Sequence, residues 1–244
     1  MASAGEAAVA LALARAAVNG DALPLGALDE SRAKSFETIH AERMWGKSAL
    51  SSSGPGSERE NAAAAVEAVV KAVELTGATS ILDIGCGDFN WQDTAIMRLP
   101  GHVLFNGADI APSAIESAKA KHPNIHFMLL DVVTQVPPES DLVICRQCLN
   151  HMSSNDAITA LRNIAASGCR WLLASHYPQG ANDPAEATAA GVSYREYNLI
   201  APPFDQSPLA SKSPEALLED EYDPERLKSG GNSMCLALWR LSPA

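Results

Sequence analysis

The chain has 244 residues, a length that suits one α/β domain with a sizeable core and is short for two. Its net charge of -11 argues against an extended nucleic-acid partner, because such binding depends on lysine and arginine neutralising phosphates, and it suits a small neutral or cationic molecule better. No apolar stretch approaches the length of about 18 residues that spans a bilayer, so we predict no membrane partner.

The cysteines and the first residues bear on the compartment. The cysteine number is odd and the positions are scattered, which is typical of buried thiols in a reducing compartment, and we predict a cytoplasmic protein: Cys86, Cys145, Cys148, Cys169 and Cys235. Cys145 and Cys148 have C-x-x-C spacing, but no second cysteine or histidine pair matches it, so we predict no metal site. Met1 to Val18 lacks the basic start of a secretory signal and predicts an amphipathic helix, with a transit peptide as the alternative.

The N-terminal part predicts a helical cap over residues 1–60. Apolar positions at near-helical spacing predict a helix from Ser31 to Trp45. The run Ser51–Ser57 is rich in serine, glycine and proline and predicts a loop with neither helix nor strand. A second helix follows from about Glu58 to Leu75, with a buried stripe of valines. Residues 61–244 then form the second part of the chain.

From Ser80 onward, predicted strands alternate with helices. The strands are 81–84, 103–105, 125–130, 142–145 and 171–174, and the helices between them include 111–121 and 156–166. Alternation at this spacing predicts right-handed crossovers and a parallel sheet covered on both faces. Residues 178–214 predict an insertion over the ligand edge of the sheet, partly helical near 184–190. The run 234–241 predicts a closing strand, with 215–222 as its antiparallel partner. We therefore expect an α/β, doubly wound, mostly parallel sheet of seven strands.

The segment Ser80–Trp91 carries the strongest functional signal. An apolar strand stops at Asp83, and Gly85 and Gly87 follow at alternate positions. Glycines here permit a tight turn and close approach of the backbone to a ligand. A carboxylate two residues before the first glycine suits a ligand with positive charge, whereas nicotinamide-binding turns usually carry an apolar residue there.

This run resembles motif I of the class I S-adenosylmethionine-dependent methyltransferases, and the resemblance extends over about Ser80 to Trp171. It implies a Rossmann-like sheet with an antiparallel closing strand and S-adenosylmethionine as cofactor, released as S-adenosylhomocysteine. Asp109, after the second strand, would accept both ribose hydroxyls, with a helix N-cap as the alternative role. Asp131, after the third strand, would accept the adenine amino group, with a solvated turn aspartate as the alternative. Ile110 would pack on the adenine.

Motif IV corresponds to 141–152, and it is similar to a group of small methyltransferases with a Cys-Arg-Asp-x-Leu-x-His pattern. Gln147 replaces that aspartate and cannot titrate. The same group carries Trp-Gly and Ser-Gly-x-Gly-Ser segments, matched by 45–46 and 53–57, and an Arg-x-x-Asn-Leu-x-x-Pro-Pro-Phe segment, matched by 195–204. Trp45 and the serine-glycine loop would close over the methionine end of the cofactor, whose carboxylate the loop N–H groups bind; a disordered linker is the alternative. The predicted cofactor-binding residues are Trp45, Ser53, Gly54, Ser57, Asp83, Gly85, Cys86, Gly87, Asp109, Ile110, Asp131, Val132, Arg146 and Gln147.

Two histidines are candidates for a catalytic base. His151 and His176 both follow strand ends on the ligand side, and imidazole titrates near neutrality. Each has a packing role as its alternative. The predicted acceptor-binding residues, some of which equally suit a structural flap, are Asn150, Tyr177, Tyr194, Arg195 and Phe204.

The sequence therefore predicts a methyltransferase for a small-molecule acceptor, with oxygen favoured over nitrogen as the acceptor atom, acting as a monomer or homodimer. A catalytically silent scaffold or partner subunit with the same fold is one alternative, kept open by Gln147. An NAD-dependent oxidoreductase is the other: Asp109 fits the acid expected there, but the third glycine is missing.

Overall fold

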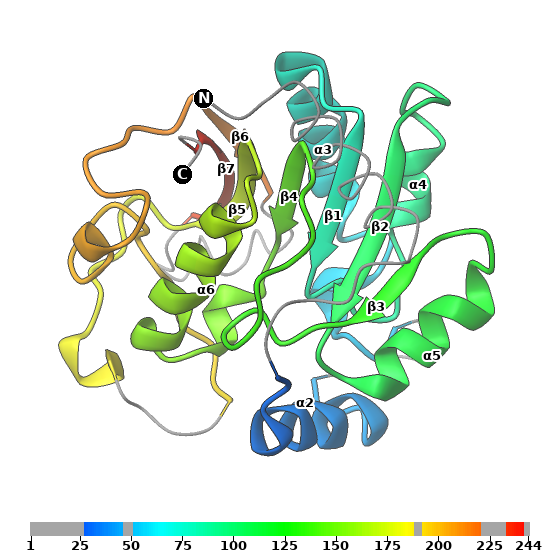
Figure 1. The fold of residues 1–244 in the computed structure, drawn as a ribbon, viewed down its shortest axis with the longest axis horizontal. Coiled ribbons are helices and arrows are strands. Elements are labelled where there is room, and N and C mark those ends of the chain that lie inside the picture. Colours follow the sequence, from blue (N-terminus) through cyan, green and yellow to red (C-terminus); the bar gives the residue numbers. More distant parts are fainter. Residues whose placement is uncertain (1–26, 46–50, 188–191, 221–232, 242–244) are drawn as a thin grey trace, which may run out of the picture.

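The computed structural model describes residues 27–45, 51–187, 192–220 and 233–241. They form one seven-stranded sheet in the order β3-β2-β1-β4-β5-β7-β6 (Figure 1). The first five strands run parallel, and β7 is antiparallel to both of its neighbours. The strands are β1 (Ser80–Ile84), β2 (Leu104–Asp109), β3 (Phe127–Leu129), β4 (Leu142–Cys145), β5 (Trp171–His176), β6 (Ala216–Glu219) and β7 (Cys235–Arg240). The predicted doubly wound sheet is confirmed, including the pairing of β6 with the closing strand.

Helices precede or connect most strands. The α-helices are α2 (Glu30–Ala41), α3 (Ala63–Thr76), α4 (Gln92–Ile96), α5 (Pro112–Lys121) and α6 (Ser154–Ala166); the short 3₁₀ turns are η1 (Pro55–Ser57), η2 (Leu149–His151), η3 (Pro184–Ala187) and η4 (Phe204–Gln206). Two helix starts have side-chain caps: Asp29 accepts the N–H of Arg32, and Ser153 accepts the N–H of Asp156. Within the described ranges, no helix is long and apolar enough to cross a membrane.

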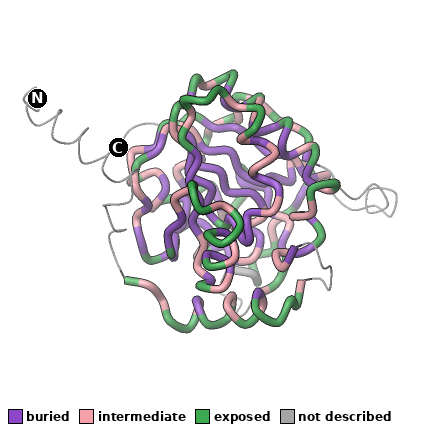
Figure 2. Tube along the Cα trace, turned by 90° about the vertical axis from the view of Figure 1, so that its right-hand side faces the viewer, coloured by how far each residue is buried: buried purple, intermediate pink, exposed green. Residues whose placement is uncertain are grey.

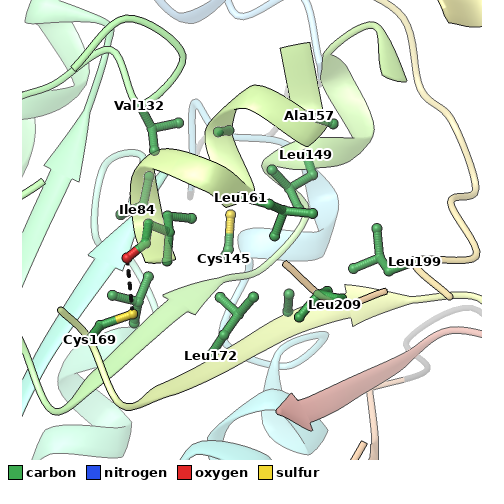
Figure 3. Close-up of a cluster of buried hydrophobic side chains, with 14 of the residues drawn as sticks. Ile84, Val132, Cys145, Leu149, Ala157, Leu161, Cys169, Leu172, Leu199 and Leu209 are labelled. Carbon is green, nitrogen blue, oxygen red and sulfur yellow. Dashed lines mark hydrogen bonds between the residues drawn. The ribbon is translucent and has the colours of Figure 1, made fainter. Parts of the chain in front are cut away.

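The central strands β1, β4, β5 and β7 are buried along most of their length (Figure 2). Their alternate residues enter two separate hydrophobic clusters on opposite faces of the sheet. Leu82 and Ile84 of β1 belong to the hydrophobic cluster on the α6 side of the sheet, together with Leu161 of α6 (Figure 3). Ile81 faces the opposite core, which contains residues of α3, α4 and α5. Polar side chains at the carboxyl ends of β1, β2 and β4 are thereby held at one edge of the sheet.

The insertion that follows β5 belongs partly to the core. Tyr197, Leu199, Phe204 and Leu209 are fully buried in the cluster on the α6 side. The Tyr197 hydroxyl donates to the carbonyl of Met152 at 3.0 Å, which ties the insertion to the segment after β4. This part of the chain is therefore more than a surface flap.

Several local predictions need correction. The helix predicted to reach Trp45 ends at Ala41, and Arg43 lies in the left-handed region with φ 53°. The run Ser51–Ser57 contains the turn η1, because Pro55 has its φ fixed at a helical value at the start of that turn. The second helix begins at Ala63, after turns. The prediction for Met1 to Val18 lies outside the described residues, and the boundary at residue 60 stays a prediction.

Candidate active site

A cavity lies at the carboxyl ends of β1, β2 and β4, with an empty volume of about 940 Å³ including its open mouth. This is where ligands bind in open α/β sheets. Most of the predicted site residues line it together: Trp45, Ser53, Ser57, Asp83, Gly85, Cys86, Gly87, Asp109, Ile110, Asp131, Val132, Arg146, Gln147 and His151. Of the predicted cofactor residues, Gly54 alone does not line the cavity.

Asp83 ends β1 at the base of this cavity and is 2% exposed. One carboxylate oxygen accepts a hydrogen bond of 2.8 Å from the Gln92 side chain. Burial raises the pKa of Asp83 to about 7, although the Arg146 charge opposes that rise. The carboxylate is therefore short of positive partners and would ionise more readily beside a cation.

Two glycines of the following turn have positive φ, and each also makes room for a neighbouring segment. A Cβ on Gly85 would come within 2.8 Å of the Cys148 Cβ, and one on Gly87 would come within 2.2 Å of the Ser53 hydroxyl. Glycine is thus required both by the turn and by packing against the loops after β4 and before α3.

Asp109, at the end of β2, lies next to that turn. Its two oxygens accept the N–H groups of Gly87 and Ala111, each at 2.9 Å. Ala111 is the N-cap residue of α5, so Asp109 does not fill that alternative role. Burial raises the pKa of Asp109. Within the described residues, neither buried Asp83 nor partly buried Asp109 forms a salt bridge, so the cavity is lined by two acids without an ion-pair partner.

Asp131, after β3, is paired with a residue that the sequence reasoning missed. It is 1% exposed and accepts from the Arg32 guanidinium at 2.6 Å, so it is not a solvated turn aspartate. Arg32 belongs to α2, together with Phe36 and His40, and all three line the cavity. Their spacing of four residues places them on one helix face, and this pattern is a signal that could have found them.

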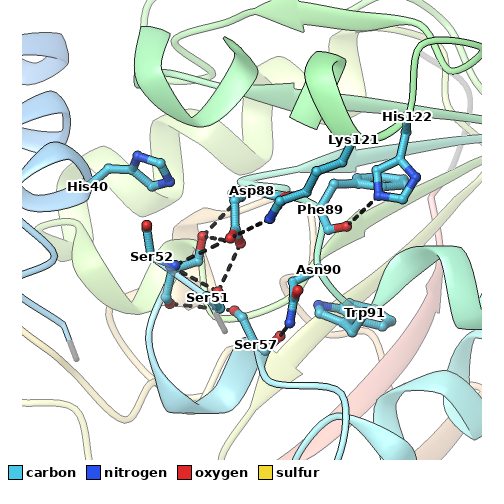
Figure 4. Close-up of polar contacts among 12 residues, drawn as sticks. His40, Ser51, Ser52, Ser57, Asp88, Phe89, Asn90, Trp91, Lys121 and His122 are labelled. Atoms are coloured by element: carbon cyan, nitrogen blue, oxygen red, sulfur yellow. Dashed lines mark hydrogen bonds and ion pairs between the residues drawn. The ribbon is translucent and has the colours of Figure 1, made fainter. Parts of the chain in front are cut away.

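The serine-glycine loop is fixed to the glycine turn by Asp88 (Figure 4). This carboxylate is almost fully buried and accepts from the hydroxyls of Ser51 and Ser53 at 2.8 and 3.1 Å and from the Lys121 ammonium at 2.9 Å. The loop therefore has a defined position beside the cavity, and the alternative of a disordered linker does not describe residues 51–57.

Arg146 lines the cavity, but its guanidinium forms an ion pair with a residue outside the cavity lining. Its guanidinium makes a two-point ion pair with buried Asp220, at 2.6 and 3.0 Å, and donates to the Gly56 carbonyl at 2.9 Å. It also lies over the Trp91 ring, 5.4 Å from the centroid. Arg146 thus joins three segments that are distant in sequence, and Asp220 neutralises it.

His151 lies beside aromatic residues at the cavity wall. The Trp45 ring stacks on it with centroids 4.4 Å apart, and the Tyr194 ring meets its edge at 5.6 Å. Burial lowers the pKa of His151 to about 4, so the imidazole is uncharged at neutral pH. Gln147, before it, has φ 50° and donates from its amide to the Met234 sulfur at 3.6 Å.

The remaining predicted residues lie outside the cavity lining. His176 is 1% exposed, accepts the Leu199 N–H at 3.1 Å and packs against Trp239. Burial also lowers the pKa of His176 to about 4. Asn150 and Arg195 exchange backbone and side-chain hydrogen bonds that hold the insertion.

The predicted aromatic residues of the acceptor side also lie outside the cavity lining, and one of them contacts His151. Phe204 is buried against Tyr197 in the core. Tyr177 is fully buried, and its hydroxyl meets that of the half-exposed Tyr194, whose ring contacts His151. Among these candidates, His151 lines the cavity and Tyr194 contacts its ring, whereas the others lie outside the cavity lining: His176, Asn150, Tyr177, Arg195 and Phe204.

Comparison with known proteins gives matches to methyltransferases. Residues 81–167 match the model of a methyltransferase domain. Trans-aconitate 2-methyltransferase from Paracidovorax citrulli is 25% identical over 124 residues, and the same enzyme from Methylobacterium nodulans is 27% identical over 137 residues. These matches cover 50% and 54% of this chain and 47% and 48% of the relatives, so the chain matches about half the length of each.

Solved structures agree in fold at low identity. Magnesium protoporphyrin IX methyltransferase from Synechocystis PCC 6803, with bound S-adenosylhomocysteine, has a TM-score of 0.59 at 16% identity, covering 88% of this chain and 100% of that one. A methyltransferase from Clostridium acetobutylicum has a TM-score of 0.53 at 9% identity, covering 74% and 92%. The chain therefore has the class I methyltransferase fold.

Proposed function

We propose that this protein transfers a methyl group from S-adenosylmethionine to a small-molecule acceptor. The observation that carries the proposal is a pair of carboxylates, buried Asp83 and partly buried Asp109, that line the cavity without a salt bridge within the described chain. Two acids would repel the phosphates of a dinucleotide and attract a ligand with ammonium and sulfonium charges. The methyltransferase match over 81–167 supports the same cofactor.

The residues at hand fit that cofactor. Asp83 would hold the ammonium group, and the ion pair would return its pKa toward the ordinary aspartate range. Asp109 keeps lone pairs on both oxygens for ribose hydroxyls, because each oxygen accepts only one backbone N–H. Ile110 and Val132 supply apolar walls for the adenine.

His151 is the base that we assign to the acceptor side. When bound, the cofactor supplies an electrophilic methyl group. His151 is uncharged at neutral pH, lines the same cavity and can take the proton that an acceptor hydroxyl loses. This role favours an oxygen acceptor over nitrogen, since a neutral amine needs only a hydrogen-bond acceptor. The contact of His151 with Trp45 and Tyr194 gives an acceptor with an apolar or planar part a surface to pack against.

The test is transfer of the labelled methyl group of S-adenosylmethionine to a panel of small hydroxyl, carboxyl and amine acceptors. We expect turnover with at least one acceptor, and a loss in kcat of about 10² to 10⁴-fold in His151→Ala with unchanged affinity for S-adenosylhomocysteine. His126→Ala, outside the cavity lining, is the matched control. Binding without transfer to any class would favour the silent-scaffold alternative. Equal activity of His151→Ala and the parent would remove His151 as the base.

A further inference from the structure

The helix α2 contributes a histidine to the cavity that no sequence motif explains. His40 projects from α2 toward the segment that carries Ser52 and Asp88 (Figure 4). It lines the cavity and is 7% exposed. Helix α2 buries little else, since Ala33 is its other buried residue. An amphipathic packing role therefore does not account for a polar ring at this position.

The two ring nitrogens of His40 have different surroundings. Nδ1 is 2.8 Å from the Ser113 hydroxyl. Nε2 is buried and has no hydrogen-bond partner among the described residues. A buried polar atom without a partner destabilises the folded protein. Because this atom belongs to a residue that lines the cavity, a bound ligand is the natural source of its missing partner.

The location of His40 indicates which part of the ligand it meets. Ser113 lies in the first turn of α5, and Asp109 accepts the N–H of Ala111 at the same helix start. Both His40 and Asp109 line the same cavity and hydrogen-bond residues at the start of α5, which places the two side chains in the same part of the site. Asp109 is the acid to which we assign the ribose.

We propose that His40 is a cofactor-binding residue whose Nε2 hydrogen-bonds a ribose hydroxyl beside Asp109, so that α2 forms one wall of the cofactor site. The inference rests on the proposed function. A hydroxyl has one proton and two lone pairs, so it can pair with Nε2 in either tautomer of the ring. Where Nε2 carries the proton, the hydroxyl accepts it and still donates to the Asp109 carboxylate; where Nε2 is bare, the hydroxyl donates to Nε2 instead. The adenine amino group can only donate, and it would fit one tautomer alone.

The experiment measures, by calorimetry on the full chain, the affinity for S-adenosylhomocysteine and for its 2′-deoxy and 3′-deoxy analogues. His40→Asn keeps an amide near Nδ1 for Ser113 and removes Nε2, whereas His40→Gln extends an amide toward the Nε2 position. We expect His40→Asn to bind S-adenosylhomocysteine about tenfold more weakly than the parent and His40→Gln to lose less. With one of the two deoxy analogues, His40→Asn and the parent should bind equally. His102→Asn, at an exposed position, is the control.

Two outcomes would overturn the inference. Parent-like affinity in His40→Asn would show that Nε2 makes no contact with the ligand. The same loss with S-adenosylhomocysteine and both deoxy analogues would move the contact away from the ribose. A parent protein that does not bind S-adenosylhomocysteine would instead contradict the proposed function, and the two failures are therefore distinguishable.

Discussion

Asp83 is a buried acid whose ionisation opposes folding. Its pKa in the folded protein is about 7 against 3.8 for the ordinary side chain, so the folded state holds a proton that the unfolded chain releases. Stability therefore falls as the pH rises from about 4 to about 7 and stays reduced above it. The full effect is on the order of 4 kcal/mol. A site that binds a cation would then be built at a cost in stability.

We expect Asp83→Asn to stabilise the ligand-free protein at pH 8, because the amide has no ionisation to lose. The gain in the free energy of unfolding should approach about 4 kcal/mol at pH 8 and shrink toward zero as the pH falls to 4. Thermal unfolding of both proteins across this range measures it. Glu219→Gln, at an exposed site on β6, should show no such gain. A parent and variant that unfold alike at pH 8 would refute the raised pKa.

The sequence alone predicted the site residues that lie at the carboxyl ends of strands. Asp83, Asp109 and Asp131 lie at or just after the carboxyl ends of parallel strands, which meet at one edge of the sheet, so their convergence could be predicted. The ion-pair partners of Arg146 and Asp131 could not be predicted from the sequence. Asp220 and Arg32 come from distant elements, and only the folded chain brings them into contact.

At the scale of elements, the serine-glycine loop and α2 form a cover that is attached mainly by polar contacts. Asp88 holds the loop, and α2 is tied down by Arg32 to Asp131 and by Glu37, which accepts the N–H of Ser113 at 2.9 Å. Elements that bury few apolar side chains open at lower free energy than the core. Such a cover suits a site from which a product must leave after each turnover.

We expect Asp88→Asn to loosen the loop while leaving the sheet intact, because the amide loses the ion pair with Lys121 and part of the serine hydrogen bonding. Amide hydrogen exchange in residues 51–57 should rise at least fivefold, and affinity for S-adenosylhomocysteine should fall severalfold. Glu67→Gln, which removes an exposed ion pair with Arg98, is the control and should change neither. Unchanged exchange in 51–57 would mean that the loop is held by other contacts.

Element boundaries were predicted less well than element types. The strand 142–145 was predicted to the residue because four buried apolar residues have polar flanks. The five-residue helix α4 was not predicted, since it is too short to show a helical period. The insertion was expected to form a cover, and the burial of Leu199, Phe204 and Leu209 against the sheet depends on tertiary contacts that no local pattern reveals.

For the whole molecule, the negative net charge and the acids that line the cavity favour the same class of ligand. The net charge of -11, together with Asp83 and Asp109 of the cavity, opposes an anionic ligand at the sheet edge and favours a cationic one. A ligand that binds the folded state alone raises its stability by about 2.7 kcal/mol at a hundredfold excess over its Kd. For a domain of this size, that corresponds to a rise in Tm of about 5–10 °C.

The most direct measurement is the Tm of the purified protein with S-adenosylhomocysteine and, separately, with NAD⁺ at equal concentration. We predict a rise of about 5–10 °C with S-adenosylhomocysteine, which Asp83→Asn abolishes, and no shift with NAD⁺. Stabilisation by NAD⁺ with no response to S-adenosylhomocysteine would contradict the assignment of this cavity.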